Sequence, residues 1–292
     1  MSDHYHPLGD WAFTRADCVT LQRPYFQRNL RLIAGNEPDY TLPWDDNMYL
    51  IYPSEATPDW KKLYQHVKEL NAISNQDSQY KIVYVMRRAH KKQVPSNPNE
   101  IDPEVSELGK KQCSTLQTGF ERAITQLGLP PPDVVVTSPL TRALQTTQWG
   151  LAPIFDSSET LVLEGLREKV TGDGKNKRHS KSWIKEQFPQ FDCRNVDDTD
   201  RFGATYCDPT NEEPYHEVWR RVYESLAFLF ENRKRDPVVL LMTHCLVIQT
   251  IQREIDGWDV PEEERKSKEF YVGEAGGYAM IIKGERSRVS SI

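Results

Sequence analysis

Short apolar runs that alternate with helical segments constrain the fold of this chain more than any other feature. The runs are short and rich in β-branched residues, which favours strands over buried helices. Apolar residues at helical spacing mark the segments between them. Strands without polar alternation are typical of a sheet covered on both faces, so we expect an α/β protein, a three-layer α/β/α sandwich with a mostly parallel central sheet. The expected strands are residues 80–86, 134–137, 159–163, 238–242 and 278–282, and the expected helices are residues 58–70, 102–127, 140–149, 219–230 and 247–255.

The first part of the chain differs from the rest. Residues 1–56 are irregular and interrupted by prolines, but they are too rich in aromatic side chains for simple disorder. Thr57 and Pro58 then suit the N-cap and the first position of a helix. We expect residues 1–77 to form an N-terminal arm and a helix that pack on the core, and the arm to be either a packed segment or a lid beside the active site. Residues 78–292 form the expected main domain, with an insert around residues 169–217.

Charge and composition exclude several classes of protein. The net charge of −6 argues against a general nucleic-acid or anionic-membrane surface. The 5 cysteines are scattered without a CxxC pair, which favours reduced thiols over disulfides or zinc, and the 7 histidines lack ligand spacing. Neither a secretory signal nor an apolar run of roughly 18 residues is visible. We expect a cytoplasmic protein with no metal and no cofactor, and a homo-oligomer stays open.

Charged and titratable residues follow the expected strands at the edge where an open α/β sheet binds its ligand. Arg87, Arg88 and Arg142 supply guanidinium groups, which bind phosphate or carboxylate oxygens bidentately. His244 directly follows a buried strand and suits a donor or acid/base role. Glu168 is the nearest candidate proton donor, although burial or substrate charge must keep its proton in place. Each residue alone has an ordinary structural interpretation; together they predict an anion site with acid/base capacity.

Five segments of the chain resemble, in order, the active-site motifs of the histidine phosphatase (phosphoglycerate mutase-like) superfamily. The late Thr-His-Gly motif of the family is matched with Cys245 in place of Gly. The resemblance covers roughly residues 78 to 285, and a basic segment at residues 176–178 resembles one in fungal relatives, so the chain is similar to a fungal-type member. The matching segments are Arg87-Arg88-Ala89 (Arg-His-Gly or Arg-His-Ala in the family), Ser106 to Gln112 (a helix start), Thr137 to Thr146 (Ser-Pro-Leu-x-Arg-Ala-x-Gln-Thr in the family), Glu164 to Glu168 (the general-acid segment) and Thr243-His244-Cys245.

The resemblance implies a role for each matched residue. Arg87, Arg142 and His244 would bind the transferred phosphate, and Glu168 would protonate the leaving oxygen. The residue at position 88 would be the phospho-accepting His, but the chain has Arg88 there. A guanidinium stays protonated and has no nucleophilic lone pair. Since losing a nucleophile can cost on the order of 10⁶ in kcat, the resemblance implies a hydrolase of a small phosphorylated metabolite that is impaired or inactive as written.

Four further residues are expected as substrate contacts: His90, Ser138, Arg178 and Cys245. His90 lies two residues beyond the nucleophile position, which displaces it by about 6–7 Å along an extended chain. In-line attack needs an approach of about 3 Å. We therefore do not expect His90 to replace the missing nucleophile. The segment after it, residues 91–95, also departs from the family's pattern.

Three interpretations of Arg88 stay open at this stage. The chain is a phosphatase in which a His at position 88 has been replaced, or a natural member that has lost phosphatase activity, or a noncatalytic scaffold that uses its aromatic arm as an interaction surface. A natural member of the second kind would bind an anionic ligand, or would use His244 and Glu168 for non-hydrolytic acid/base chemistry. A retained Glu168 argues weakly against the scaffold, which has no use for a proton donor.

Overall fold

A six-stranded sheet forms the centre of the computed structural model, which describes residues 11–15 and 59–286 apart from 75–77, 94–100, 156–159, 207, 209 and 257–271. Strand β6 is antiparallel to its neighbours β1 and β2, and the other neighbouring pairs are parallel. The predicted α/β fold with a mostly parallel sheet is therefore confirmed. In spatial order the strands are β1 (Trp11–Arg15), β6 (Gly277–Arg286), β2 (Ser78–Arg87), β5 (Val238–Thr243), β3 (Val134–Thr137) and β4 (Thr160–Val162).

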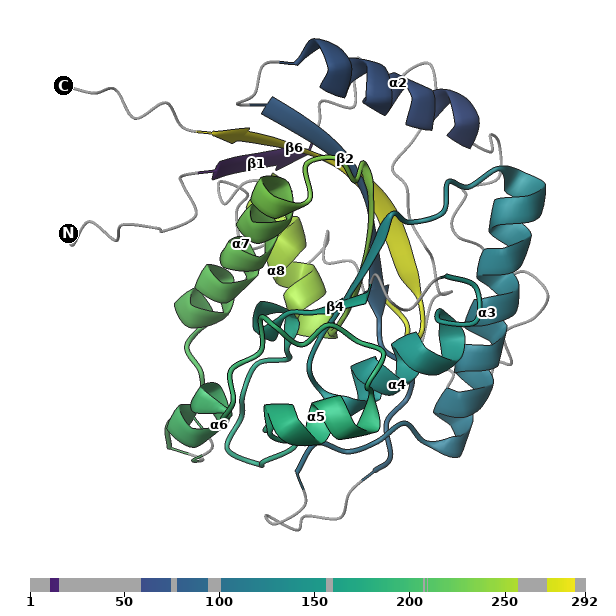
Figure 1. Ribbon diagram of the computed structural model, residues 1–292. Coiled ribbons are helices and arrows are strands. Elements are labelled where there is room, and N and C mark those ends of the chain that lie inside the picture. The colour runs from purple at the N-terminus through teal and green to yellow at the C-terminus, as the bar shows by residue number, and fades with distance from the viewer. Residues whose placement is uncertain are drawn as a thin grey trace, which may run out of the picture.

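Helices cover both faces of the sheet (Figure 1). Along β2, Val83 and Val85 pack into one core, whereas Ile82, Tyr84 and Met86 pack into the other. Both faces of the strand are thus buried, which explains its uninterrupted apolar run. The first core is covered by α7 (Tyr215–Asn232) and α8 (Cys245–Asp256), and the second by α2 (Trp60–Ile73), α3 (Glu107–Leu127) and α4 (Thr141–Gly150).

The starts of two helices differ from the prediction. Helix α2 is capped by Asp59, whose carboxylate accepts a hydrogen bond from the Lys62 backbone at 3.1 Å, while Thr57 lies outside the described residues. Helix α3 begins after Ser106 rather than at Asp102, because the Asp102 carboxylate is bound elsewhere and Ser106 is the next residue able to cap. The predicted end of α3 at Gly128 is confirmed, with a left-handed φ of 71°.

The sequence prediction missed three elements. Strand β1 lies in the arm expected to be irregular, and it pairs with the edge strand β6. The expected insert contains two short helices, α5 (Lys181–Gln187) and α6 (Arg201–Tyr206), which are too short for a periodic signal. Residues 1–10 and 16–58 lie outside the described residues, so the arm, its role as a lid and the scaffold interpretation stay predictions. Within the described ranges, no helix has both the length and the apolar character to cross a bilayer.

Candidate active site

Two consecutive arginines lie at the carboxyl end of β2. Arg87 is in register with Thr243 on the neighbouring strand β5, so the ends of the two strands meet. Arg88 Nη1 donates to Glu274 Oε1 at 2.5 Å, and the same oxygen lies 3.7 Å from Arg87 Nη2. Arg87 Nη1 donates to the Val272 carbonyl at 2.8 Å. The segment that precedes β6 therefore holds both guanidinium groups, and it supplies a carboxylate, that of Glu274, which contacts both.

Arg142, in the first turn of α4, brings a third guanidinium to the same end of the sheet. Its side chain is buried; Nη2 donates to Asn176 Oδ1 at 2.6 Å and Nη1 donates to the Lys175 carbonyl at 3.1 Å. Asp102 Oδ1 lies 3.7 Å from Nη1, and the Asp102 carboxylate also accepts from Thr141 at 2.8 and 2.9 Å. Burial lowers the pKa of Arg142 to about 10. The group stays cationic at neutral pH, and its orientation is fixed.

His244 lies among these cations at the start of α8. Its ring is buried, and Nε2 lies 2.8 Å from Ser138 Oγ. Burial first, and then the charges of Arg142 and Arg88, lower the pKa of His244 well below its usual value. The ring is therefore neutral at physiological pH. In the part of the chain that is described, Nδ1 is buried and has no hydrogen-bond partner.

Glu168, the expected proton donor, is half-buried on the loop after η2 (Glu164–Leu166). Its Oε1 accepts from the Lys169 backbone at 3.1 Å. Its charge counteracts the effect of burial on the pKa of both Arg88 and Arg142, so the carboxylate lies within electrostatic reach of the two guanidinium groups. The structure thus brings Arg88, Arg142, His244 and Glu168 to one place, as the strand ends predict.

A buried ion pair fixes the backbone on both sides of Glu168. Arg221 on α7 donates through Nη1 to the carbonyls of Gly165 and Arg167, both at 2.6 Å, and through Nε to Glu213 at 2.7 Å. Glu213 also accepts from the Val170 backbone at 2.9 Å. The pair therefore ties the loop that carries Glu168 to the helix behind it. The sequence analysis did not identify it, because its partners have no common motif.

Arg178 corrects one expectation. The residue is 2% exposed, and each nitrogen of its guanidinium donates to the protein. Nε donates to both oxygens of Glu164 at 3.0 and 2.9 Å, Nη1 donates to the His179 carbonyl, and Nη2 donates to the carbonyls of Asp197 and Thr199. These bonds use four of the five N–H groups. The structure thus argues against the expected substrate contact of Arg178 and indicates that the residue holds the insert against the loop after β4.

The other expected contacts have different surroundings. Ser138 lies against His244 inside the site. His90 Nδ1 lies 2.7 Å from the hydroxyl of Ser106, the N-cap of α3, so its ring is held at that helix start. Cys245 is half-buried at the first position of α8. Of these three, Ser138 directly contacts another residue of the predicted anion site, His244.

Sequence reasoning missed Glu274 and the role of Asp102. Both occur at or beside an unusual backbone conformation: Asp102 has φ 49° and Ala275 has φ 57°, the two non-glycine positive φ values among the described residues. Ala275 donates its N–H to the Arg88 carbonyl at 3.1 Å, which turns Glu274 toward Arg88. Such conformations cluster at functional sites and cost on the order of 1–3 kcal/mol each.

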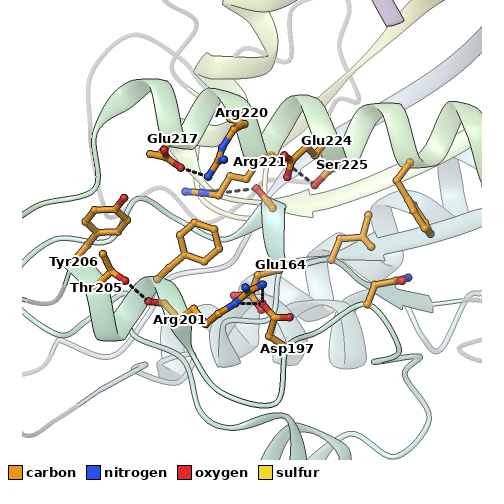
Figure 2. Close-up of a pocket in the computed structure, with 15 residues that line it drawn as sticks. Glu164, Asp197, Arg201, Thr205, Tyr206, Glu217, Arg220, Arg221, Glu224 and Ser225 are labelled. Carbon is orange, nitrogen blue, oxygen red and sulfur yellow. Dashed lines mark hydrogen bonds and ion pairs between the residues drawn. The ribbon is translucent and has the colours of Figure 1, made fainter. Parts of the chain in front are cut away.

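A separate cavity of about 580 Å³ lies between α6, α7 and the loop after β4. Figure 2 shows Glu217 and Arg220 on α7 across from Tyr206 and Arg201 of α6. The exposed arginines are paired within the wall, Arg220 with Glu217 and Arg201 with Asp197 at 2.6 Å. Arg87, Arg88, Arg142 and His244 do not line it. The cavity is therefore distinct from the cationic site.

Comparisons with known proteins identify the family of this chain. The family model described as "Histidine phosphatase superfamily (branch 1)" matches residues 93–270, beginning shortly after Arg87 and Arg88. No curated protein matches the chain. Among the described residues, no group of three or more His, Cys, Asp or Glu side chains is placed to hold a metal ion.

Several solved structures are similar to this chain. A mycobacterial glucosyl-3-phosphoglycerate phosphatase is 19% identical, with 70% of this chain and 91% of that chain covered and a TM-score of 0.44. The alpha-ribazole phosphatase from Shigella flexneri is 18% identical (68% and 93% covered, TM-score 0.44), and a phosphoglycerate mutase from Bacillus anthracis is 17% identical (70% and 89% covered, TM-score 0.45). Since the family model matches more than half of the chain, this protein belongs to the histidine phosphatase superfamily (branch 1).

Proposed function

We propose that this protein binds a small phosphorylated metabolite in a phosphatase-type pocket and that Arg88 occupies the position of the phospho-accepting His. Arg87, Arg142 and His244 bind the phosphate, and Glu168 is the proton donor for the leaving oxygen. Phosphohistidine chemistry is impaired or absent as the chain is written. The acidic composition and scattered cysteines favour a cytoplasmic location and argue against a nucleic-acid or membrane partner.

The observation that carries this proposal is the set of hydrogen bonds made by the side chains of Arg88, His90 and His244. The Arg88 guanidinium donates to Glu274 and offers no lone pair for attack on phosphorus. The imidazoles of His90 and His244 are held at other residues, His90 at Ser106 and His244 at Ser138. Three guanidinium groups around a neutral His supply strong donors to phosphate oxygens. Affinity for the anion is therefore retained where the nucleophile is missing.

A second function has one specific observation in its favour. Burial and the surrounding arginines lower the pKa of His244, so the ring is neutral, and a bound anion would offset the arginine charges that disfavour its protonation. A natural pseudophosphatase would use this ring, together with Glu168, for non-hydrolytic acid/base chemistry on an anionic ligand. The same site would also serve simple binding of that ligand.

The test is release of phosphate from an aryl phosphate by the unchanged chain and by two variants. Arg88→His supplies the missing imidazole, and the matched control Arg88→Met removes the guanidinium without supplying a nucleophile. We expect turnover from Arg88→His only. Turnover by the unchanged chain would contradict the account of the nucleophile. Equal inactivity of all three proteins would favour the second function.

A further inference from the structure

The cavity of about 580 Å³ between α6, α7 and the loop after β4 has the size and the lining of a ligand site. Pockets of roughly 300–1,000 Å³ hold small organic ligands, and aromatic side chains with a few polar groups commonly line them. Phe202 and Tyr206 of α6 and Phe228 of α7 line this cavity with half-buried rings, and Leu163 adds an apolar side chain. The cavity therefore offers an aromatic surface on which a ligand can pack.

Buried contacts hold the walls of the cavity in place. The centroid of the Phe202 ring lies 5.5 Å from the guanidinium carbon of Arg167 and 5.9 Å from that of Arg221, and both arginines are buried. Arg221 also donates to the Gly165 carbonyl at 2.6 Å. A Cβ atom at Gly165 would lie 2.1 Å from the Ser225 hydroxyl oxygen, so the loop after β4 packs directly on α7. Because these walls are already ordered, a ligand pays little to order them.

Two ion pairs on opposite walls supply charges to the cavity (Figure 2). On α7, Arg220 is paired with Glu217, and on the insert, Arg201 is paired with Asp197 at 2.6 Å. Exposed ion pairs contribute little to stability, so a ligand can replace one partner by its own charge at small cost. The side chains of the α7 pair are 51% and 20% exposed, against 75% and 40% for the other pair. Solvent therefore screens the α7 pair less, and it is the stronger candidate for binding a charged ligand.

A zwitterion matches the α7 pair, because it carries both charges on neighbouring atoms. Its carboxylate takes the guanidinium of Arg220 and its ammonium takes the carboxylate of Glu217, so both protein charges keep a partner. A ligand with one charge separates the pair and leaves the other member unpaired. The half-buried rings favour a ligand with an aromatic side chain, since aromatic rings pack on one another in offset or edge-on geometry.

We propose that this cavity is a second ligand site, which binds a small aromatic zwitterion such as an aromatic amino acid through the Arg220–Glu217 pair and the three aromatic rings. The inference does not rest on the proposed function, because the arginines and the histidine of the cationic site do not line the cavity. Gly165 does line it, three residues before Glu168, which places the second site next to the segment that leads to the proposed proton donor.

The experiment is an NMR titration of the full chain with L-phenylalanine or L-tryptophan, followed through the broadening of the ligand's proton signals. Three relatives of L-phenylalanine each lack one feature: phenethylamine lacks the carboxylate, 3-phenylpropanoate lacks the ammonium, and L-alanine lacks the ring. We expect both aromatic amino acids to bind with a Kd on the order of 1 mM, as suits ligands of about 12 to 15 non-hydrogen atoms. Each relative should bind about fivefold or more weakly, because a charge-assisted contact or the ring packing is lost.

Two variants test whether the ligand lies in this cavity. Arg220→Met should weaken the binding of L-phenylalanine about fivefold or more without weakening that of phenethylamine, which has no carboxylate. Thr205→Trp puts a large ring at an exposed position of α6 that lines the cavity, so it should abolish binding. The matched control is Arg122→Met, since Arg122 is an exposed arginine of α3 that does not line the cavity and its loss changes the net charge equally. It should bind both amino acids as the unchanged chain does, and thermal unfolding checks the fold of each variant.

Several results would overturn the second site. The inference is wrong if neither amino acid binds the unchanged chain, or if phenethylamine and 3-phenylpropanoate bind as tightly as L-phenylalanine, because the charged pair then has no role. Undiminished binding to a folded Thr205→Trp protein would place the ligand elsewhere. An equal loss in Arg220→Met and Arg122→Met would show a general charge effect and would also overturn the assignment, even if Thr205→Trp did not fold.

Discussion

Replacing Arg221 by Met should destabilise the protein severely, whereas replacing its exposed neighbour Arg220 should not. The Arg221 side chain is 3% exposed and that of its partner Glu213 is 0% exposed, so neither group is solvated by water. The change leaves the Glu213 carboxylate buried without its cation and removes the donor to the Gly165 and Arg167 carbonyls. Breaking a buried pair by removing one partner costs about 3–5 kcal/mol, and each buried carbonyl left unsatisfied costs about 1–3 kcal/mol. These costs overlap, so we expect a loss of about 4 kcal/mol or more.

Urea unfolding, followed by circular dichroism, measures this loss as a change in the free energy of unfolding. The neighbouring residue provides a matched control: Arg220 is paired with Glu217, but its side chain is 51% exposed. An exposed pair contributes roughly 0–1 kcal/mol, so Arg220→Met should change stability little. The double variant Arg221→Met with Glu213→Leu should lose less than the sum of the two single changes, because no buried charge is then left unpaired. An Arg221→Met protein within about 1 kcal/mol of the unchanged chain would refute this reasoning.

Three further predictions follow from the site. Glu274→Gln removes the negative charge that holds Arg88, so phosphate affinity measured by calorimetry should rise about three- to tenfold; an unchanged or lower affinity would contradict the role of this contact. The pKa of His244 is depressed below its usual 6.5, so the contribution of the neutral ring to stability is present above pH 6.5 and is lost as the pH falls. The urea midpoint should therefore fall more steeply from pH 7 to pH 5 for the unchanged chain than for His244→Gln. Parallel curves for the two proteins would argue against a neutral buried ring. Arg178→Met should cost about 3 kcal/mol or more of stability because Glu164 loses a buried partner, with phosphate affinity unchanged; a selective loss of affinity would restore Arg178 as a ligand contact.

Apart from β1, the strands that the structure describes could be predicted from sequence, because both faces of the sheet are buried there. Strand β3 lies at the four residues expected, since a run of valines leaves little choice of element. Helix starts were less predictable, because a residue able to cap a helix can instead use its side chain to bind another part of the chain. Asp102 has the chemistry of a cap, yet it binds Thr141, 39 residues along the chain. Only the folded chain brings these two residues together.

The candidate site likewise contains some residues that could be predicted from sequence and others that could not. Arg88, Arg142, Glu168 and His244 could be grouped from sequence, because the carboxyl ends of parallel strands meet at one edge. Glu274 could not, since it precedes the antiparallel strand β6 and contacts Arg88 across 186 residues of sequence. Arg178 was expected to contact the substrate for a related reason. The basic segment around it indicates only that the side chain is charged, whereas the burial of Arg178 against Glu164 depends on the path of the insert.

Calorimetric titration of inorganic phosphate into the full chain, beside Arg88→Met, tests the central claim most directly, namely that the pocket still binds phosphate and that Arg88 is part of it. We predict saturable binding at one site, weakened roughly tenfold in Arg88→Met because one charge-assisted donor is lost and Glu274 keeps only the more distant of its two arginine partners described here, Arg87. Absence of saturable binding, or equal affinity of the two proteins, would contradict it.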